Sequence, residues 1–279
     1  MMNEESTPLS SLLAPPKCAL VVAHPGHELR VHHWMETHRP LYFCLTDGSG
    51  RAGASRMGST ARVLNNVGAA QGTIFGRFTD REVYQVLLEG QHEKFASLVQ
   101  QLAGELLAHD IATVAGDAPE GVNPTHDLCR YLIDMAVVAV EGASGRRIAS
   151  YEFVLDAPPN QCPPELRGQA LWVKLDDAAL DRKLEAALGY PELKGETEEG
   201  LRYYGKQAFA LECLIPSTSA AAFEKFELEA PAYERFGREG VDRFGKSYGG
   251  YQDVITFQKH VKPAVQAMQA AARSFAPAV

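Results

Sequence analysis

The chain has 279 residues, of which 46% are hydrophobic, and a formal net charge of −8. This composition is typical of a globular protein, and the acidic balance argues against general affinity for nucleic-acid phosphates, which requires a concentrated basic surface. No run of about 18 apolar residues predicts a membrane span. The N-terminal sequence does not resemble a signal peptide, so we expect a cytoplasmic protein that acts on a small molecule.

The five cysteines do not form a recognisable framework. They are scattered and odd in number, and none belongs to a C-x-x-C pair. The pattern therefore predicts neither a set of disulfides nor a thiolate zinc site. We expect most of them to pack as small core residues.

In chain order, a flexible segment is expected at residues 1–16, and regular periodicity follows it. Short apolar runs predict buried strands at 18–23, 41–46, 111–116, 148–155 and 170–175. Apolar residues at helical spacing predict helices at 28–38, 59–70, 91–109 and 128–139. Asn123 and Pro124 are suited to the N-cap and first position of the last of these helices.

Strands that alternate with helices predict an α/β fold with a mainly parallel sheet and helices on both faces. Residues 177–279 are richer in charge and in helix formers, and we expect them to form an α-rich extension packed on the same domain. Ligands of such sheets bind at the carboxyl ends of the strands. His24, His27 and His126 all follow predicted strands and should meet at that edge.

Three imidazoles from two loops are able to bind zinc and to leave a fourth position open for water, as in catalytic sites. Histidines near strand ends are also common as hydrogen-bonded structural groups. The pair His24 and His27, taken alone, would favour that structural interpretation.

A wider set of residues resembles the LmbE/PIG-L family of zinc-dependent N-deacetylases. The first strand ends in Ala-His-Pro-x-x-Glu, a Thr-x-Gly turn follows the second strand, and a later Pro-x-His begins a helix. The family signatures are Ala-His-Pro-Asp-Asp-Glu and His-Pro-Asp-His, and the similarity covers roughly residues 17–155. It implies a Rossmann-like domain at 17–176, and zinc or another divalent metal held by His24, His27 and His126.

The sequence also departs from this family. Gly26 stands at the position of the family's general base, an aspartate, and His27 replaces a ligand aspartate. Asn123 and Thr125 replace the first His and the Asp of the second signature. Histidine is as good a zinc ligand as aspartate, so the pattern indicates a preserved metal site with altered proton chemistry.

A metal held by three neutral imidazoles can lower the pKa of bound water to near 7, which favours a nucleophile without an adjacent base. The leaving amine still needs a proton. Asp47 is the favoured catalytic carboxylate because its turn borders the family's active site, and the other candidates are Glu28, Asp117 and Asp127.

Two further residues are assigned roles by position. Asn123 could donate to a developing oxyanion, although its role as an N-cap is the stronger interpretation. Arg56 could bind a sugar hydroxyl or an anionic group of the substrate, or could be a solvated surface residue.

The sequence thus favours a metal-dependent amide hydrolase that deacetylates an N-acetyl amino sugar or a related small N-acyl conjugate. The alternative is a non-catalytic metal- or sugar-binding descendant of the same family, and a third option is another reaction on the same scaffold. Restoring Asp at Gly26 is a test that distinguishes the first two. Nucleic-acid and membrane partners are not expected, and a homo-oligomer is compatible with the sequence.

Overall fold

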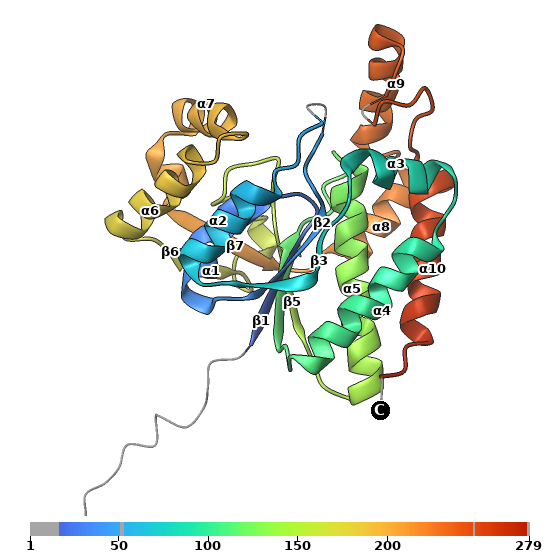
Figure 1. Cartoon of the computed structure of the whole chain (residues 1–279), viewed down its shortest axis with the longest axis horizontal. Coiled ribbons are helices and arrows are strands. Elements are labelled where there is room, and N and C mark those ends of the chain that lie inside the picture. Colours follow the sequence, from blue (N-terminus) through green and yellow to red (C-terminus); the bar gives the residue numbers. More distant parts are fainter. Residues whose placement is uncertain (1–16, 51–52, 248, 278–279) are drawn as a thin grey trace, which may run out of the picture.

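The computed structural model describes residues 17–50, 53–247 and 249–277, so the flexible segment expected at 1–16 lies outside the described residues. A seven-stranded sheet forms the centre of the molecule, in the order β3-β2-β1-β4-β5-β7-β6 (Figure 1). The strands are β1 (Cys18–Val22), β2 (Leu41–Thr46), β3 (Ala70–Phe78), β4 (Thr113–Asp117), β5 (Ala149–Phe153), β6 (Leu171–Lys174) and β7 (Leu211–Pro216).

The first five strands are parallel, whereas β7 runs antiparallel to both β5 and β6. Strand β1 is buried along its whole length because both faces of the sheet are covered. Ala19 and Val21 pack in one hydrophobic cluster, and Leu20 and Val22 pack in another on the opposite face. The alternation follows from the two-residue period of a strand.

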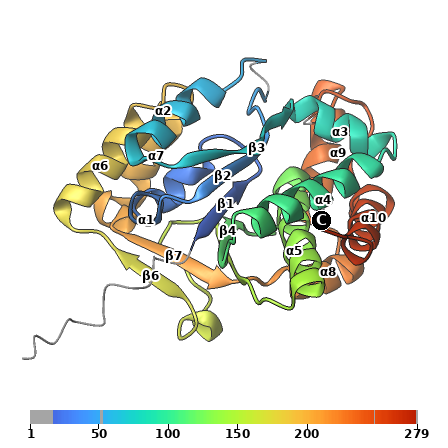
Figure 2. The ribbon, with the colours of Figure 1, turned by 60° about the horizontal axis from the view of Figure 1, so that its bottom comes forward.

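Helices cover each face of the sheet (Figures 1 and 2). One layer contains α1, α2, α6 and α7, and the other contains α3, α4, α5, α8, α9 and α10. Their bounds are α1 His32–His38, α2 Met57–Val67, α3 Asp80–Leu88, α4 Glu93–Ala108, α5 Pro124–Ser144, α6 Asp177–Leu188, α7 Lys194–Tyr204, α8 Ser219–Leu228, α9 Ala232–Phe244 and α10 Lys262–Arg273. None of the described helices is both long enough and apolar enough to cross a bilayer.

The strand order places a switch point beside β1. Strand β1 pairs with β2 on one side and with β4 on the other, and all three are parallel. Their carboxyl ends therefore lie at one edge of the sheet, next to the point where the chain changes direction of winding. Open α/β sheets bind ligands at such points.

The predicted α/β class with a mainly parallel, helix-covered sheet is confirmed. All five predicted strands are present, within one or two residues at most ends. Two further strands, β3 and β7, were not predicted, and β7 comes from the extension that was expected to be α-rich. The five cysteines are all buried and free, as expected.

Candidate active site at the carboxyl ends of three strands

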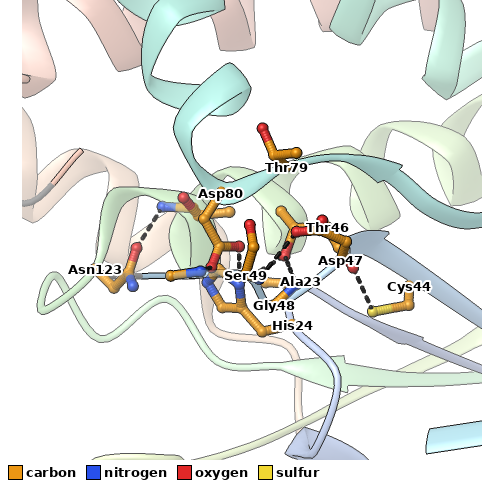
Figure 3. A network of polar contacts seen from close by, with 12 residues as sticks. Ala23, His24, Cys44, Thr46, Asp47, Gly48, Ser49, Thr79, Asp80 and Asn123 are labelled. Atoms are coloured by element: carbon orange, nitrogen blue, oxygen red, sulfur yellow. Dashed lines mark hydrogen bonds and ion pairs between the residues drawn. The ribbon is translucent and has the colours of Figure 1, made fainter. Parts of the chain in front are cut away.

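His24 lies two residues after the end of β1. Its Nδ1 lies 2.7 Å from Oγ1 of Thr46 and 2.9 Å from Oδ1 of Asp80 (Figure 3). An ionised aspartate only accepts hydrogen bonds, so Nδ1 of His24 is the donor and Nε2 carries the free lone pair. That Nε2 is buried and has no hydrogen-bond partner among the described residues.

Asp80 is delivered by the first turn of α3. Its Oδ2 accepts a hydrogen bond from the backbone N–H of Gly50 at 2.6 Å. Burial opposes ionisation of Asp80, but the hydrogen bonds from His24, Thr46 and Gly50 outweigh it and lower its pKa to about 2. Asp80 is therefore an anion that fixes the orientation of the His24 ring.

His27 has an equivalent carboxylate partner at the end of β4. Its Nδ1 lies 2.9 Å from Oδ2 of Asp117, a fully buried side chain. The same Oδ2 accepts from the backbone N–H of Ala23 at 2.8 Å, while Oδ1 has no partner among the described residues. Asp117 thus joins the ends of β1 and β4 and holds the His27 ring.

His126 lies in the first turn of α5, and its ring completes a triangle. The ring centroids of His24, His27 and His126 are 5.2, 5.0 and 4.7 Å apart, and each pair meets edge to face. Burial, followed by the adjacent His27 and His24 rings, lowers the pKa of His126 well below its ordinary value. His126 is consequently neutral at pH 7, which is the form that binds metals.

Imidazole nitrogens such as those of these three rings are common zinc ligands. A tetrahedral zinc with imidazole nitrogens at about 2.1 Å spaces the ring centroids about 5 Å apart, as these rings are spaced. Two of the rings are held by carboxylates through the second nitrogen, as metal-binding histidines usually are. However, no three His, Cys, Asp or Glu side chains of the described residues have the arrangement of a formed metal-binding group. The rings therefore have the spacing and the carboxylate partners found in zinc sites, but not the donor geometry of a formed one.

The loop that carries His24 and His27 is stabilised by hydrogen bonds to a buried glutamate. Glu28 is fully buried and accepts hydrogen bonds from the Gly26 backbone N–H at 2.8 Å, the Thr60 hydroxyl at 2.6 Å and the Tyr42 hydroxyl at 3.0 Å. Burial raises the pKa of Glu28. Its bonds are all directed into the protein, so its position explains the shape of the loop.

Gly26 itself has φ of +106°, in a region that side chains of L-residues rarely adopt. A Cβ at this position would lie 2.2 Å from Cδ1 of Leu193 and 3.8 Å from the ring of Tyr190. The space in which a side chain at position 26 would begin is therefore filled by residues from the extension.

Two cavities border the histidines. The larger, of about 810 Å³, is lined by all three histidines and by residues from several loops and helices, among them Arg56, Asp80, Asn123, Glu196 and Lys246. The smaller, of about 410 Å³, is lined by His27 and His126 and includes apolar side chains of Leu29, Val122, Leu155 and Leu193. Arg56 and Glu196 line both cavities.

The three other predicted site residues differ in position. Arg56 lines both cavities and has no ion pair with any described residue. Asn123 lines the larger cavity, and its Oδ1 accepts from the Thr125 backbone N–H at 2.9 Å as the N-cap of α5. Asp47 accepts from the Ser49 backbone N–H at 2.9 Å within its turn and is not among the residues that line either cavity.

The remaining candidates for proton transfer are enclosed. Asp117 and Asp127 are fully buried, like Glu28, and none of the three lines a cavity. Asp127 accepts from the backbone N–H of Gly121 at 3.0 Å, and burial raises its pKa to about 8.

Sequence analysis missed Asp80 and Glu196. Thr79 and Glu82 form a capping box at the start of α3, and this pattern was readable in the sequence. It places Asp80 in a first helical turn but not beside His24, since the contact depends on how α3 packs. No local signal identifies Glu196, which reaches the cavities only through the packing of α7.

Comparison with known proteins gives a shared fold. No protein-family model matches the sequence, and no curated protein matches it. The crystal structure of the conserved protein TT1542 from Thermus thermophilus is similar, with a TM-score of 0.50 and 17% identity over 72% of this chain and 94% of that chain.

Two deacetylase structures are more distant. A triple mutant of the deacetylase Orf2 of the teicoplanin biosynthetic pathway has a TM-score of 0.47 and 14% identity, over 72% of this chain and 97% of that chain. The A40926 pseudoaglycone deacetylase Dbv21 has a TM-score of 0.40 and 17% identity, over 72% and 96%. At these values the likeness extends to the fold and carries no assignment of activity.

Proposed function

We propose that this protein is a metal-dependent hydrolase that removes the acyl group from a small N-acyl conjugate, such as an N-acetyl amino sugar. The observation that carries the proposal is the triangle of His24, His27 and His126, with centroids 4.7–5.2 Å apart at the carboxyl ends of β1 and β4. The resemblance of the surrounding sequence to the LmbE/PIG-L signatures supports the same reaction class.

The metal would be held by His24, His27 and His126. When bound, a divalent ion polarises the acyl carbonyl and lowers the pKa of water. Asp80 and Asp117 would orient two of the ligand rings, because each already contacts the Nδ1 of one histidine. Both carboxylates also increase the basicity of the nitrogen on the far side of the ring.

The substrate would bind in the two cavities that meet at His27 and His126. The larger cavity has the size of a ligand pocket, and its lining includes polar side chains that could bind the hydroxyls of a sugar. Arg56 would bind a hydroxyl or anionic group, since its guanidinium has no ion-pair partner among the described residues. The amide N–H of Asn123 is available for the carbonyl oxygen, because its cap uses only Oδ1.

A non-catalytic role is the second candidate, and one observation favours it. Gly26 has no carboxylate, and Leu193 fills the space beside it. A protein that binds a metal or a sugar without catalysing a reaction would tolerate the absence of a carboxylate at position 26. The proposed experiment must therefore measure metal and turnover separately.

The test is elemental analysis of the purified protein beside His24→Ala, His27→Ala and His126→Ala. His109→Ala is the matched control, because His109 is exposed and Glu105 on α4 is its one ion-pair partner among the described residues. We expect about one divalent ion per chain in the wild type and the control, and its loss in the three variants. The metal-loaded protein is then assayed with N-acetyl and longer N-acyl glucosamines for release of free amine.

Metal that stays in all three variants, or a wild type that takes up none on titration, contradicts the ligand assignment. Metal binding without release of amine from any substrate supports the non-catalytic role instead.

A further inference from the structure

Helix α7 brings a carboxylate to both cavities. Glu196 lies near the start of this helix and lines the larger and the smaller cavity, together with His27 and His126. In the described part of the chain it has no ion pair or hydrogen-bond partner for its side chain. Other acidic residues of α7 do pair, since Glu198 lies 3.9 Å from Lys194 and Glu199 lies 3.7 Å from Arg202.

The other carboxylates beside the cavities are engaged or reach only one of them. Asp80 in the larger cavity is bound to His24 and Gly50. Glu120 in the smaller cavity accepts from the backbone N–H groups of Leu155 and Asp156, at 2.7 and 3.1 Å. Asp156 lines the smaller cavity but not the larger one. Glu196 is thus the one unpaired carboxylate among the described residues that borders both.

The same segment explains why position 26 carries no side chain. Leu193, the N-cap residue of α7, would lie 2.2 Å from a Cβ on Gly26. Glu196 follows Leu193 by three residues and so lies on the neighbouring turn of the same helical face. Helix α7 removes the room for a carboxylate at position 26 and supplies one from another direction.

We propose that Glu196 is the general base and then the general acid of the hydrolysis, a role that rests on the proposed function. The sequence favours Asp47, but Asp47 lines neither cavity and its Oδ1 is bound to Ser49. Glu196 is exposed and borders both cavities, so a carboxylate is present wherever a water molecule and a substrate would share them.

The proton transfers balance. The Glu196 carboxylate takes one proton from a water molecule as the water oxygen forms a bond to the acyl carbon, and the carbonyl electron pair moves onto its oxygen. That pair then re-forms the carbonyl while the carbon–nitrogen bond breaks, and the Glu196 carboxylic acid donates its proton to the departing nitrogen. The products are a carboxylic acid and an amine, and Glu196 is again ionised.

The experiment compares Glu196→Ala and Asp47→Asn with Glu198→Ala, a control from the same helix that lines neither cavity. We expect Glu196→Ala to lower kcat by about 10²- to 10⁴-fold, the usual contribution of a general acid–base. Sodium formate should restore part of the rate in Glu196→Ala only, because a small carboxylate can enter the vacated space. Glu198→Ala should keep kcat within a factor of about three of the wild type, and a loss of about 10²-fold or more in Asp47→Asn with full activity in Glu196→Ala would overturn the proposal in favour of Asp47.

Zinc affinity, measured by calorimetry on the metal-free proteins, is the second readout. An unchanged Kd in Glu196→Ala is expected for a residue that transfers protons and does not bind the ion. A tenfold weaker Kd would instead make Glu196 a metal ligand and overturn the proposal. Full activity of Glu196→Ala in the presence of an active wild type overturns the role of Glu196 alone, whereas a wild type that hydrolyses no substrate overturns the proposed function and this role together.

Discussion

Replacement of Gly26 by alanine tests whether Leu193 controls what position 26 can carry. The backbone at Gly26 has φ of +106°, and an L-residue there is strained by about 1–3 kcal/mol. The added Cβ would also approach Cδ1 of Leu193 to 2.2 Å, so Leu193 must move, and overpacking of this kind costs about 1–3 kcal/mol. We therefore expect Gly26→Ala to lower the free energy of unfolding by about 4 kcal/mol.

The assay is urea denaturation of a double-mutant cycle that combines Gly26→Ala with Leu193→Ala. In the Leu193→Ala background only the backbone strain remains, so Gly26→Ala should cost about 2 kcal/mol less than in the wild type. Gly145→Ala is the matched control, because Gly145 also has a positive φ, of 70°, but has no atom near its Cβ position. Gly145→Ala should lower the free energy of unfolding by about 1 kcal/mol. An equal loss from Gly26→Ala with and without Leu193 would refute the steric reasoning.

Three further predictions concern buried carboxylates. Asp117→Asn removes the anion that holds His27 and should weaken zinc binding about 10- to 100-fold by calorimetry; an unchanged Kd would contradict this supporting role. The raised pKa of Asp127, about 8 against 3.8 for the unfolded chain, means that its contribution to stability is present below about pH 4 and is lost as the pH rises through 8. Asp127→Asn should therefore gain about 2 kcal/mol relative to the wild type between about pH 6 and pH 8 in urea denaturation, and parallel curves would show that this carboxyl ionises freely in the fold. Lys183 pairs with Glu212 at 2.7 Å, with side chains 3% and 0% exposed, so Lys183→Met should cost about 3 kcal/mol of unfolding free energy; a loss below about 1 kcal/mol would indicate that the backbone N–H groups alone sustain the Glu212 charge.

The local sequence pattern was sufficient to predict β1 and β2, but not β3 and β7. Strand β1 is an uninterrupted apolar run because both of its faces are covered. Strand β3 lies at the sheet edge, and its sequence AQGTIFGRF has Ile74 as its only fully buried residue. Strand β7 contains Glu212, whose charge suggests a surface although Lys183 and two backbone N–H groups compensate it in the interior. Both segments form strands because of contacts with residues distant in the sequence. A local sequence pattern does not contain that information.

The same distinction applies to the site. His24, His27 and His126 were predicted because each follows a strand or begins a helix whose position the topology fixes. Of the two carboxylates that contact these rings, Asp117 lies at the end of β4 and was among the candidate residues. Asp80 lies on α3 and was not predicted. Carboxylates carried by packed helices are outside the reach of motif analysis.

Gly26 shows why a motif difference alone cannot decide whether a site is active. Judged by the sequence, the glycine is a lost base, and restoring aspartate there should restore activity if the rest of the site is intact. The structure changes that expectation, because Leu193 occupies the position and the backbone angle opposes any side chain. An inactive Gly26→Asp variant would therefore report steric conflict and not a dead site. Helix α7 fills that space and carries a carboxylate of its own, Glu196, beside both cavities. Substitution of Glu196, and not of Gly26, therefore tests whether the site has a base.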